Sequence, residues 1–130
     1  MKHFNHKYIY DVEVVSIYDG DTVRVNIDLG FGHVWKGTDG KGVKLRLYGI
    51  NTPEVRGKER PEGLKSKQAL VDLLKDNEVI LKTHKDSTGK YGRYLATLYV
   101  NILNENNEAA DTINVNEWLV ENGYAEYRNY

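Results

Sequence analysis

With 130 residues, the chain is long enough for one domain with a real hydrophobic core and too short for two domains of ordinary size. Hydrophobic residues make up 40% and charged residues 28% of the sequence, which is typical of globular proteins and argues against global disorder. A formal net charge of −1 argues against coating of nucleic acid by bulk positive charge, and the absence of cysteine excludes disulfides and thiolate metal sites.

The first half of the chain is predicted to form strands. Residues 8–18 are rich in β-branched and aromatic side chains, and residues 21–29 alternate apolar with polar ones. The Asp-Gly pair between them is typical of a two-residue hairpin turn. A glycine-rich loop over residues 30–42 then leads to a third predicted strand over residues 43–50.

An amphipathic helix is predicted next, from Pro61 to about Lys75, because proline suits the first turn of a helix and an apolar stripe follows. The stripe consists of Leu64, Ala69, Leu70, Leu73 and Leu74. Strands are predicted over residues 78–84 and 94–103, with a turn over 87–93 between them. The polar residues 104–111 are interpreted as a loop tip or linker.

A short second helix is predicted over residues 115–122. Asn114 stands three residues before Glu117, which is the spacing of an N-cap with its capping-box partner, and Gly123 suits the C-terminal end.

The order of these elements, β-β-β-α-β-β-α, is the order expected of a five-stranded OB-type β-barrel with a helix between strands three and four. This is a mainly β fold of the α+β class, although other small α+β domains share the order. We expect a single domain over residues 1–130 with its core at about 8–127.

Three polar clusters lie at strand ends or turns. In "DGDT", a hairpin turn explains Asp19 and Gly20 but does not require Asp21, whose carboxylate can point out of the barrel. The second cluster surrounds Arg46, which alternates with the leucines of the third strand and is a rigid bidentate donor suited to a phosphate.

The same second cluster continues after the strand. Asn51 and Thr52 supply the hard oxygen atoms that Ca²⁺ or Mg²⁺ prefers, and Glu54 is close enough in sequence to accept a proton from a bound water. Taken singly, each of these residues is explained more simply as a turn cap or a surface salt bridge.

A third cluster, "GKYGR", contains Lys90, Tyr91 and Arg93. It is explained either by a hairpin turn with solvent-facing cations or by a second guanidinium at the same end of the barrel. Basic residues also gather over 56–67 and acids over 11–21, which suits a polyanion and a metal on opposite sides, or two solvated patches.

Four motifs, in this order and on this frame, resemble those of the staphylococcal nuclease family: "DGDT", "LRLYGINTPE", "GKYGRYLA" and "VNEWLVENGYAEY". The match extends from about Val14 to Tyr127. One such motif alone is weak, whereas four in register are specific. The resemblance implies a Ca²⁺-dependent endonuclease that hydrolyses DNA and RNA, prefers single strands and leaves 3′-phosphate ends.

The resemblance also implies a role for each matched residue. Ca²⁺ ligands are implied at Asp21, Asn51 and Thr52 (the last through its backbone carbonyl), with Asp19 behind them. Catalytic roles are implied for Arg46 and Arg93, which hold the reacting phosphate, and for Glu54 as general base. Contacts to a terminal phosphate of the nucleotide are implied for Lys90 and Tyr91.

The metal site departs from the family pattern at Asn51, where the family usually has an aspartate. Because ligand charge helps to set affinity, we expect weaker Ca²⁺ binding. His3 and His6 suggest zinc, but a pair in an N-terminus that is expected to fray is interpreted as inert.

Two aromatic features have open interpretations. Tyr127 and Tyr130 offer faces on which a base could stack. The loop over residues 30–42 is longer than expected; Trp35 and Lys41 would make it an extra substrate contact, or it is a hairpin extension without function.

Two rival functions remain open. A non-catalytic nucleic-acid-binding OB module with a weakened metal site is favoured by Asn51, whereas a protein-interaction domain is disfavoured by the complete set of Arg46, Arg93 and Glu54. We expect a monomer that acts on DNA and RNA. With no apolar run as long as a membrane span and no apolar signal region in "MKHFNHKYIY", we expect no membrane association and a cytoplasmic protein, unless a precursor is secreted.

Overall fold

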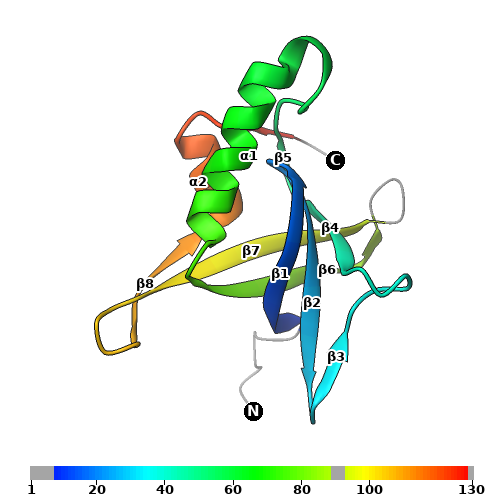
Figure 1. Cartoon of the computed structure of the whole chain (residues 1–130), viewed down its shortest axis with the longest axis vertical. Coiled ribbons are helices and arrows are strands. Elements are labelled where there is room, and N and C mark those ends of the chain that lie inside the picture. Colours follow the sequence, from blue (N-terminus) through cyan, green and yellow to red (C-terminus); the bar gives the residue numbers. More distant parts are fainter. Residues whose placement is uncertain (1–7, 89–92, 129–130) are drawn as a thin grey trace.

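The computed structural model describes residues 8–88 and 93–128, in which it places two α-helices, a short 3-10 helix and nine strands (Figure 1). The strands are β1 (Ile9–Asp19), β2 (Thr22–Gly30), β3 (His33–Trp35), β4 (Val43–Leu47), β5 (Ile50–Asn51), β6 (Glu78–Thr88), β7 (Tyr94–Leu103), β8 (Ala109–Asn114) and β9 (Glu126–Tyr127). The helices are the 3-10 helix η1 (Gly57–Glu59), α1 (Arg60–Leu74) and α2 (Val115–Glu121).

Five of the strands close into a barrel. β1 pairs with both β2 and β6, and the ring continues from β6 through β7 and β4 back to β2. β4 and β7 run parallel, and the other pairs in the ring are antiparallel. This closed five-stranded barrel with two helices confirms the predicted OB-type fold.

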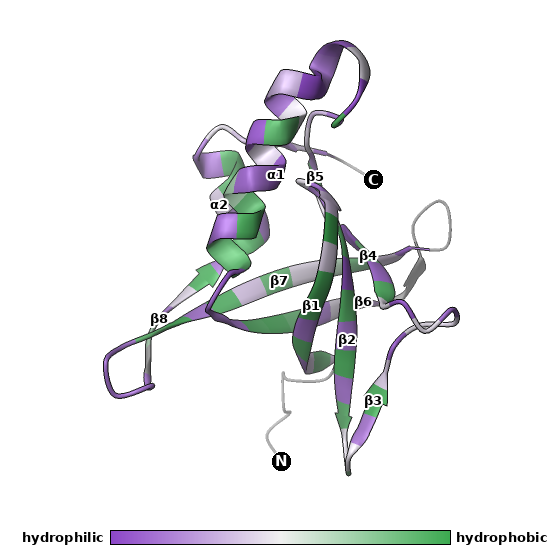
Figure 2. Cartoon of the chain, viewed as in Figure 1, coloured by the Kyte–Doolittle hydropathy of each residue, from purple (hydrophilic) through white to green (hydrophobic). Residues whose placement is uncertain are grey.

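The barrel interior is filled by apolar side chains that point inward at every second position. Val23, Val25 and Ile27 of β2 are buried, and the polar residues between them lie on the outer face; Figure 2 shows the alternation as changing colours along β2. Leu45 and Leu47 of β4 are fully buried in the same way. The intervening positions of β2 and β4 therefore face outward, and they carry the polar residues Thr22, Arg24, Lys44 and Arg46.

Helix α1 packs against β1 and beside α2 (Figure 1). Its predicted apolar stripe is only partly correct: Leu70 and Leu74 are buried, Leu73 is partly buried, and Leu64 is 40% exposed. Among the residues that the structure describes, no helix combines the length and apolar character needed to cross a membrane.

The buried positions in the first turns of α1 are occupied by small residues, because the helix lies close to the backbone of the segment after β5 there. Gly63 and Ser66 are buried, and a Cβ on Gly63 would collide with the backbone carbonyl of Glu54. The hydroxyl of Ser66 donates to the Tyr124 carbonyl at 2.7 Å. This close approach fixes the backbone that carries Glu54.

Four strands, β3, β5, β8 and β9, depart from the elements predicted from the sequence. The loop over residues 30–42 contains β3, which extends β2 as a hairpin, and the polar stretch 104–111 runs into β8, which pairs with β7. The predicted strand 43–50 is interrupted at Gly49, whose φ of 79° lies in the left-handed region, and continues as β5. β5 pairs with β9 near the C-terminus.

The predicted ends of α2 are present. The Asn114 side chain accepts a hydrogen bond from the Glu117 N–H at 3.1 Å, as an N-cap does, and Gly123 has a φ of 80°. The buried side chain of Asn116 donates to the Tyr48 and Ala96 carbonyls at 2.9 and 3.1 Å, which ties α2 to the end of β4 and to β7.

Candidate active site

An open cleft of about 860 Å³ lies where the β1–β2 turn meets the segment that follows β4. Seven residues singled out from the sequence line it: Asp19, Asp21, Arg46, Asn51, Thr52, Glu54 and Arg93. Lys90 and Tyr91 fall outside the described residues. Tyr127 lies on β9 opposite Ile50, is 67% exposed and is not among the residues that line the cleft.

Tight packing of three segments positions Asp21. A Cβ on Gly20 would lie 2.9 Å from both the Ser66 Cβ and the Thr52 Cγ2, so the β1–β2 turn, α1 and the segment after β4 meet where only glycine fits. The Leu47 N–H donates to the Asp21 carbonyl at 2.8 Å, which ties the turn to the end of β4. The Asp21 side chain is therefore directed toward Thr52.

Arg46 bridges two of the proposed Ca²⁺ ligands. Its Nη2 lies 3.3 Å from Asp21 Oδ2 and donates to Asn51 Oδ1 at 3.2 Å, while Nη1 donates to the Leu47 carbonyl at 2.9 Å. Asp21 Oδ2 also accepts from the Thr52 N–H at 2.9 Å. Asp21 and Arg46 are both only 5% exposed, so this ion pair lies in a site with little water around it.

A second guanidinium and an exposed carboxylate open onto the same cleft. Arg93, immediately before β7, donates from Nη1 to Thr22 Oγ1 at 3.4 Å, and that hydroxyl in turn donates to Asp21 Oδ1 at 3.1 Å. Glu54 is exposed, and its backbone is held against Gly63 of α1. The cleft thus combines two arginines, one accessible carboxylate and a buried aspartate.

The two aspartates of the β1–β2 turn have opposite pKa shifts. Burial, together with the hydrogen bond to Asp21 and its charge, raises the pKa of Asp19 from 3.8 to about 7. Burial also acts to raise the pKa of Asp21, but the hydrogen bond to Asp19, the charge of Arg46 and the Thr52 N–H outweigh it and lower the pKa of Asp21. Without metal, the pair therefore favours one negative charge over two.

An Asp19→Asn variant is expected to be more stable than the unchanged protein in EDTA at neutral pH. Because the folded-state pKa of Asp19 is raised to about 7, its ionisation costs stability progressively as pH rises from about 4 to 7. The amide removes this cost and can still accept the Asp21 N–H, so we expect a gain of about 2 kcal/mol above pH 7. Urea unfolding at several pH values measures it.

The gain should disappear near pH 4, where Asp19 is protonated in both the folded and unfolded states. Asp11→Asn, at an exposed position on β1, removes the same charge elsewhere and is the control. If Asp19→Asn and the unchanged protein show the same pH dependence of unfolding, the ionisation of Asp19 does not cost the fold stability.

The donor atoms of the cleft fit Ca²⁺. Within residues 8–88 and 93–128, no group of three or more His, Cys, Asp or Glu side chains could hold a metal ion, so a site must also use amide and carbonyl oxygens. Asp21 and Asn51 direct oxygens at one nitrogen of Arg46, and Thr52 Oγ1 is buried without a hydrogen-bond partner in the described part of the chain. This oxygen-only set suits a hard cation, with a single carboxylate among the predicted ligands.

Four further cations line the cleft and were not assigned to the site from the sequence: Arg24, Lys44, Arg56 and Arg128. The alternation of β2 and β4 places Arg24 and Lys44 on the outer face, so periodicity alone could have found them. Arg128 arrives through the pairing of β9 with β5, where its N–H donates to the Gly49 carbonyl at 2.7 Å. No local signal in the sequence indicates that pairing.

The sequence of the chain is similar to a protein family and to curated proteins. A family model described as staphylococcal nuclease homologue matches residues 44–130. The chain is 33% identical over 141 residues to an uncharacterized protein of Methanocaldococcus jannaschii, covering 92% of this chain and 59% of that protein. It is 36% identical over 90 residues to Protein ParB of Escherichia coli, covering 69% of this chain and 42% of that protein. The chain thus spans less than two thirds of the length of either relative.

Proposed function

Because the chain belongs to the staphylococcal nuclease family, we propose that it is a Ca²⁺-dependent nuclease that hydrolyses phosphodiester bonds within DNA and RNA and prefers single strands. Family membership indicates a protein that binds or cuts nucleic acid. The metal dependence and the cutting are inferred from the residues of the cleft.

The observation that carries this proposal is the convergence of Arg46, Arg93 and Glu54 on one cleft beside Asp21. Attack of water on a phosphodiester concentrates negative charge on the phosphate oxygens. Two guanidinium groups held in advance can offset that charge, and each such donor contributes about 10²–10³ in rate. A buried ion pair and a bond to Thr22 hold these arginines in place, which makes them suitable for that role.

In the proposed reaction, Glu54 orients the attacking water and accepts its proton. The water oxygen bonds to phosphorus while the P–O5′ bond breaks and O5′ takes a proton from solvent water, so the products carry a 3′-phosphate and a 5′-hydroxyl. Asp21, Asn51 and the Thr52 carbonyl would hold Ca²⁺, with Asp19 behind them. The chemistry that a bound Ca²⁺ would supply is additional positive charge to offset the charge that develops on the phosphate.

The proposal also gives roles to residues at the margins of the cleft. Lys90 and Tyr91 contact a terminal phosphate of the nucleotide, as the family resemblance implies. Tyr127, exposed beside the strand that carries Asn51, offers a face for a base.

A second candidate function is a nucleic-acid-binding module without catalysis. It is favoured by one observation: Arg46 forms an ion pair with Asp21 and donates a hydrogen bond to Asn51, so the two proposed ligands have a cationic partner without any metal. Such a cleft could hold a strand through its arginines even if Ca²⁺ binding were too weak for cutting.

The test is incubation with heat-denatured DNA across a Ca²⁺ titration, with EDTA as control. The nuclease is expected to cut increasingly as Ca²⁺ rises, to stop in EDTA, and to leave ends from which a phosphatase releases 3′-phosphate. Binding of single strands without cutting, at every Ca²⁺ concentration and also in Asn51→Asp, would support the binding module. A protein that neither binds nor cuts contradicts both functions.

A further inference from the structure

Two cations stand beside the proposed catalytic residues on the outer face of the barrel. Arg24 of β2 and Lys44 of β4 are direct cross-strand partners, and Thr22 and Arg46 are the next outward pair along the same two strands. All four residues line the cleft. The cationic surface therefore continues from Arg46 along β2 and β4.

The spacing of these pairs matches a nucleic-acid strand. Two residues along a strand span about 6.6 Å, which is comparable to the separation of neighbouring phosphates in an extended single strand. If the phosphate to be cut lies at Arg46 and Arg93, the next phosphate along one direction of the strand lies over Arg24 and Lys44. Both cations are fixed to barrel strands, so the spacing is maintained by the ladder of β2 and β4.

Arg24 keeps part of its hydrogen-bonding capacity. Its Nη1 lies 3.0 and 3.3 Å from the two carboxylate oxygens of Asp39 and donates to the Gly42 carbonyl at 3.2 Å. Within the described part of the chain, Arg24 makes no hydrogen bond through Nη2 or Nε, and Lys44 is exposed and forms no ion pair. A phosphate can therefore bind Arg24 and Lys44 without disrupting the strand pairing of the barrel.

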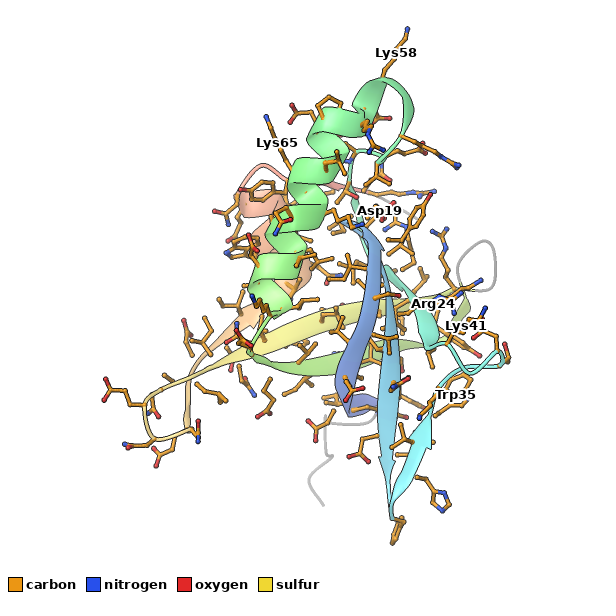
Figure 3. All side chains as sticks on the ribbon, in the orientation of Figure 1. Asp19, Arg24, Trp35, Lys41, Lys58 and Lys65 are labelled. Carbon is orange, nitrogen blue, oxygen red and sulfur yellow. The ribbon has the colours of Figure 1, made fainter. Side chains whose placement is uncertain are left out.

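The long loop between β3 and β4 brings Asp39 to Arg24. The loop is compact: the Gly42 N–H donates to the Lys36 carbonyl at 2.7 Å, and a Cβ on Gly42 would lie 3.0 Å from the Arg24 Cβ. The Lys41 N–H and the Arg24 guanidinium hold the pKa of Asp39 low, so this carboxyl is charged. Figure 3 shows Arg24 and Lys41 on the same side of the molecule.

Trp35, at the end of β3 and just before this loop, has a structural role. The rings of Trp35 and Tyr94 are in edge-to-face contact, with their centroids 5.8 Å apart, and Trp35 also packs against the barrel core. Asp39, through its contact with Arg24, is therefore the residue of the β3–β4 loop that can affect a ligand in the cleft.

We propose that Arg24 and Lys44 form a second phosphate-binding subsite for single-stranded nucleic acid, next to the position of cleavage, and that Asp39 lowers its affinity by competing for Arg24. The subsite deepens the proposed function and rests on it for the placement of the strand. An exposed carboxylate–guanidinium pair is weak, so the phosphate of a bound strand can share or replace Asp39 on Arg24.

The test compares binding of a dinucleotide with binding of an oligodeoxynucleotide of about ten residues, within the site sizes typical of OB folds. Binding is measured in the Glu54→Gln background, where cutting does not interfere. Lys44→Gln is expected to weaken binding of the longer strand about 3- to 10-fold and to lower the slope of log affinity against log salt by about 0.7. The dinucleotide, whose one phosphate occupies the position of cleavage, should bind unchanged.

Asp39→Asn is expected to have the opposite effect and to tighten binding of the longer strand only. Lys75→Gln removes the same charge outside the cleft and should change neither ligand's affinity. The proposed subsite is wrong if Lys44→Gln leaves the affinity for the longer strand unchanged or weakens binding of both ligands equally. It is also wrong if Lys75→Gln lowers the affinity for the longer strand as much as Lys44→Gln does. Because the readout is binding, a protein that never cuts would overturn the proposed nuclease while leaving the subsite intact.

Discussion

Glu54→Gln is expected to lower the rate of DNA and RNA cleavage by about 10²- to 10⁴-fold, the contribution typical of a general base. The amide has nearly the shape of the carboxylate but cannot accept the proton of the attacking water. Within the described residues the Glu54 carboxylate makes no hydrogen bond or ion pair, and its backbone is fixed against Gly63. The substitution should therefore leave the fold intact. Initial rates on heat-denatured DNA at saturating Ca²⁺, with unfolding temperatures, measure both effects.

Glu59→Gln is the matched control for this prediction. Glu59 lies on the neighbouring η1, is exposed and does not line the cleft, so the same change of charge should leave the rate within about twofold. An unchanged rate in Glu54→Gln would remove Glu54 from the reaction. Equal losses in the two variants would indicate a general effect of charge near the cleft.

The barrel could be predicted because its strands carry their pattern locally. β2 alternates apolar and polar residues, and the structure buries Val23, Val25 and Ile27 accordingly. The Asp-Gly turn and the Asn114 cap also depend on neighbours in sequence, and both are present.

The elements that the sequence did not predict depend on distant partners. β8 is assembled from the residues "AADTIN", which have little strand character of their own, because β7 offers them an edge. Helical periodicity likewise predicted Leu64 as buried, but the surface that α1 meets there is the backbone at Glu54, which requires Gly63. Local pattern cannot reveal what a residue will be packed against.

In the candidate site, too, the sequence predicted the local features but not those that depend on long-range packing. Residue types and motif order indicated Asp21, Arg46, Asn51, Thr52 and Glu54, and the fold brings all five to one cleft. The burial of Arg46 and its bridge between Asp21 and Asn51 could not be read from alternation, which predicts only an outward-facing side chain. That bridge arises because the chain turns back after β4.

Asn51→Asp is expected to tighten Ca²⁺ binding by about one to two orders of magnitude, because the number of charged ligands shifts affinity over decades at oxygen sites. Asn51 Oδ1 lies 3.2 Å from Arg46 Nη2, which also contacts Asp21, so the new carboxylate would also attract Arg46 in the metal-free protein. A divalent ion gains more from the added charge than one guanidinium does, and the net effect therefore favours the metal. Calorimetric titration with Ca²⁺, without nucleic acid, measures the affinity directly.

Asn106→Asp is the matched control, since Asn106 lies in the exposed turn between β7 and β8 and gains the same charge far from the cleft. If both variants bind Ca²⁺ equally well, the gain comes from net charge and not from a ligand. If Asn51→Asp binds no more tightly than the unchanged protein, residue 51 does not contact the ion, and the remaining donors, Asp21 and Thr52, are too few to hold Ca²⁺ by themselves. If Asn51→Asp binds Ca²⁺ more tightly and also cleaves DNA at lower Ca²⁺ concentrations, the asparagine at position 51 sets the Ca²⁺ requirement of the reaction.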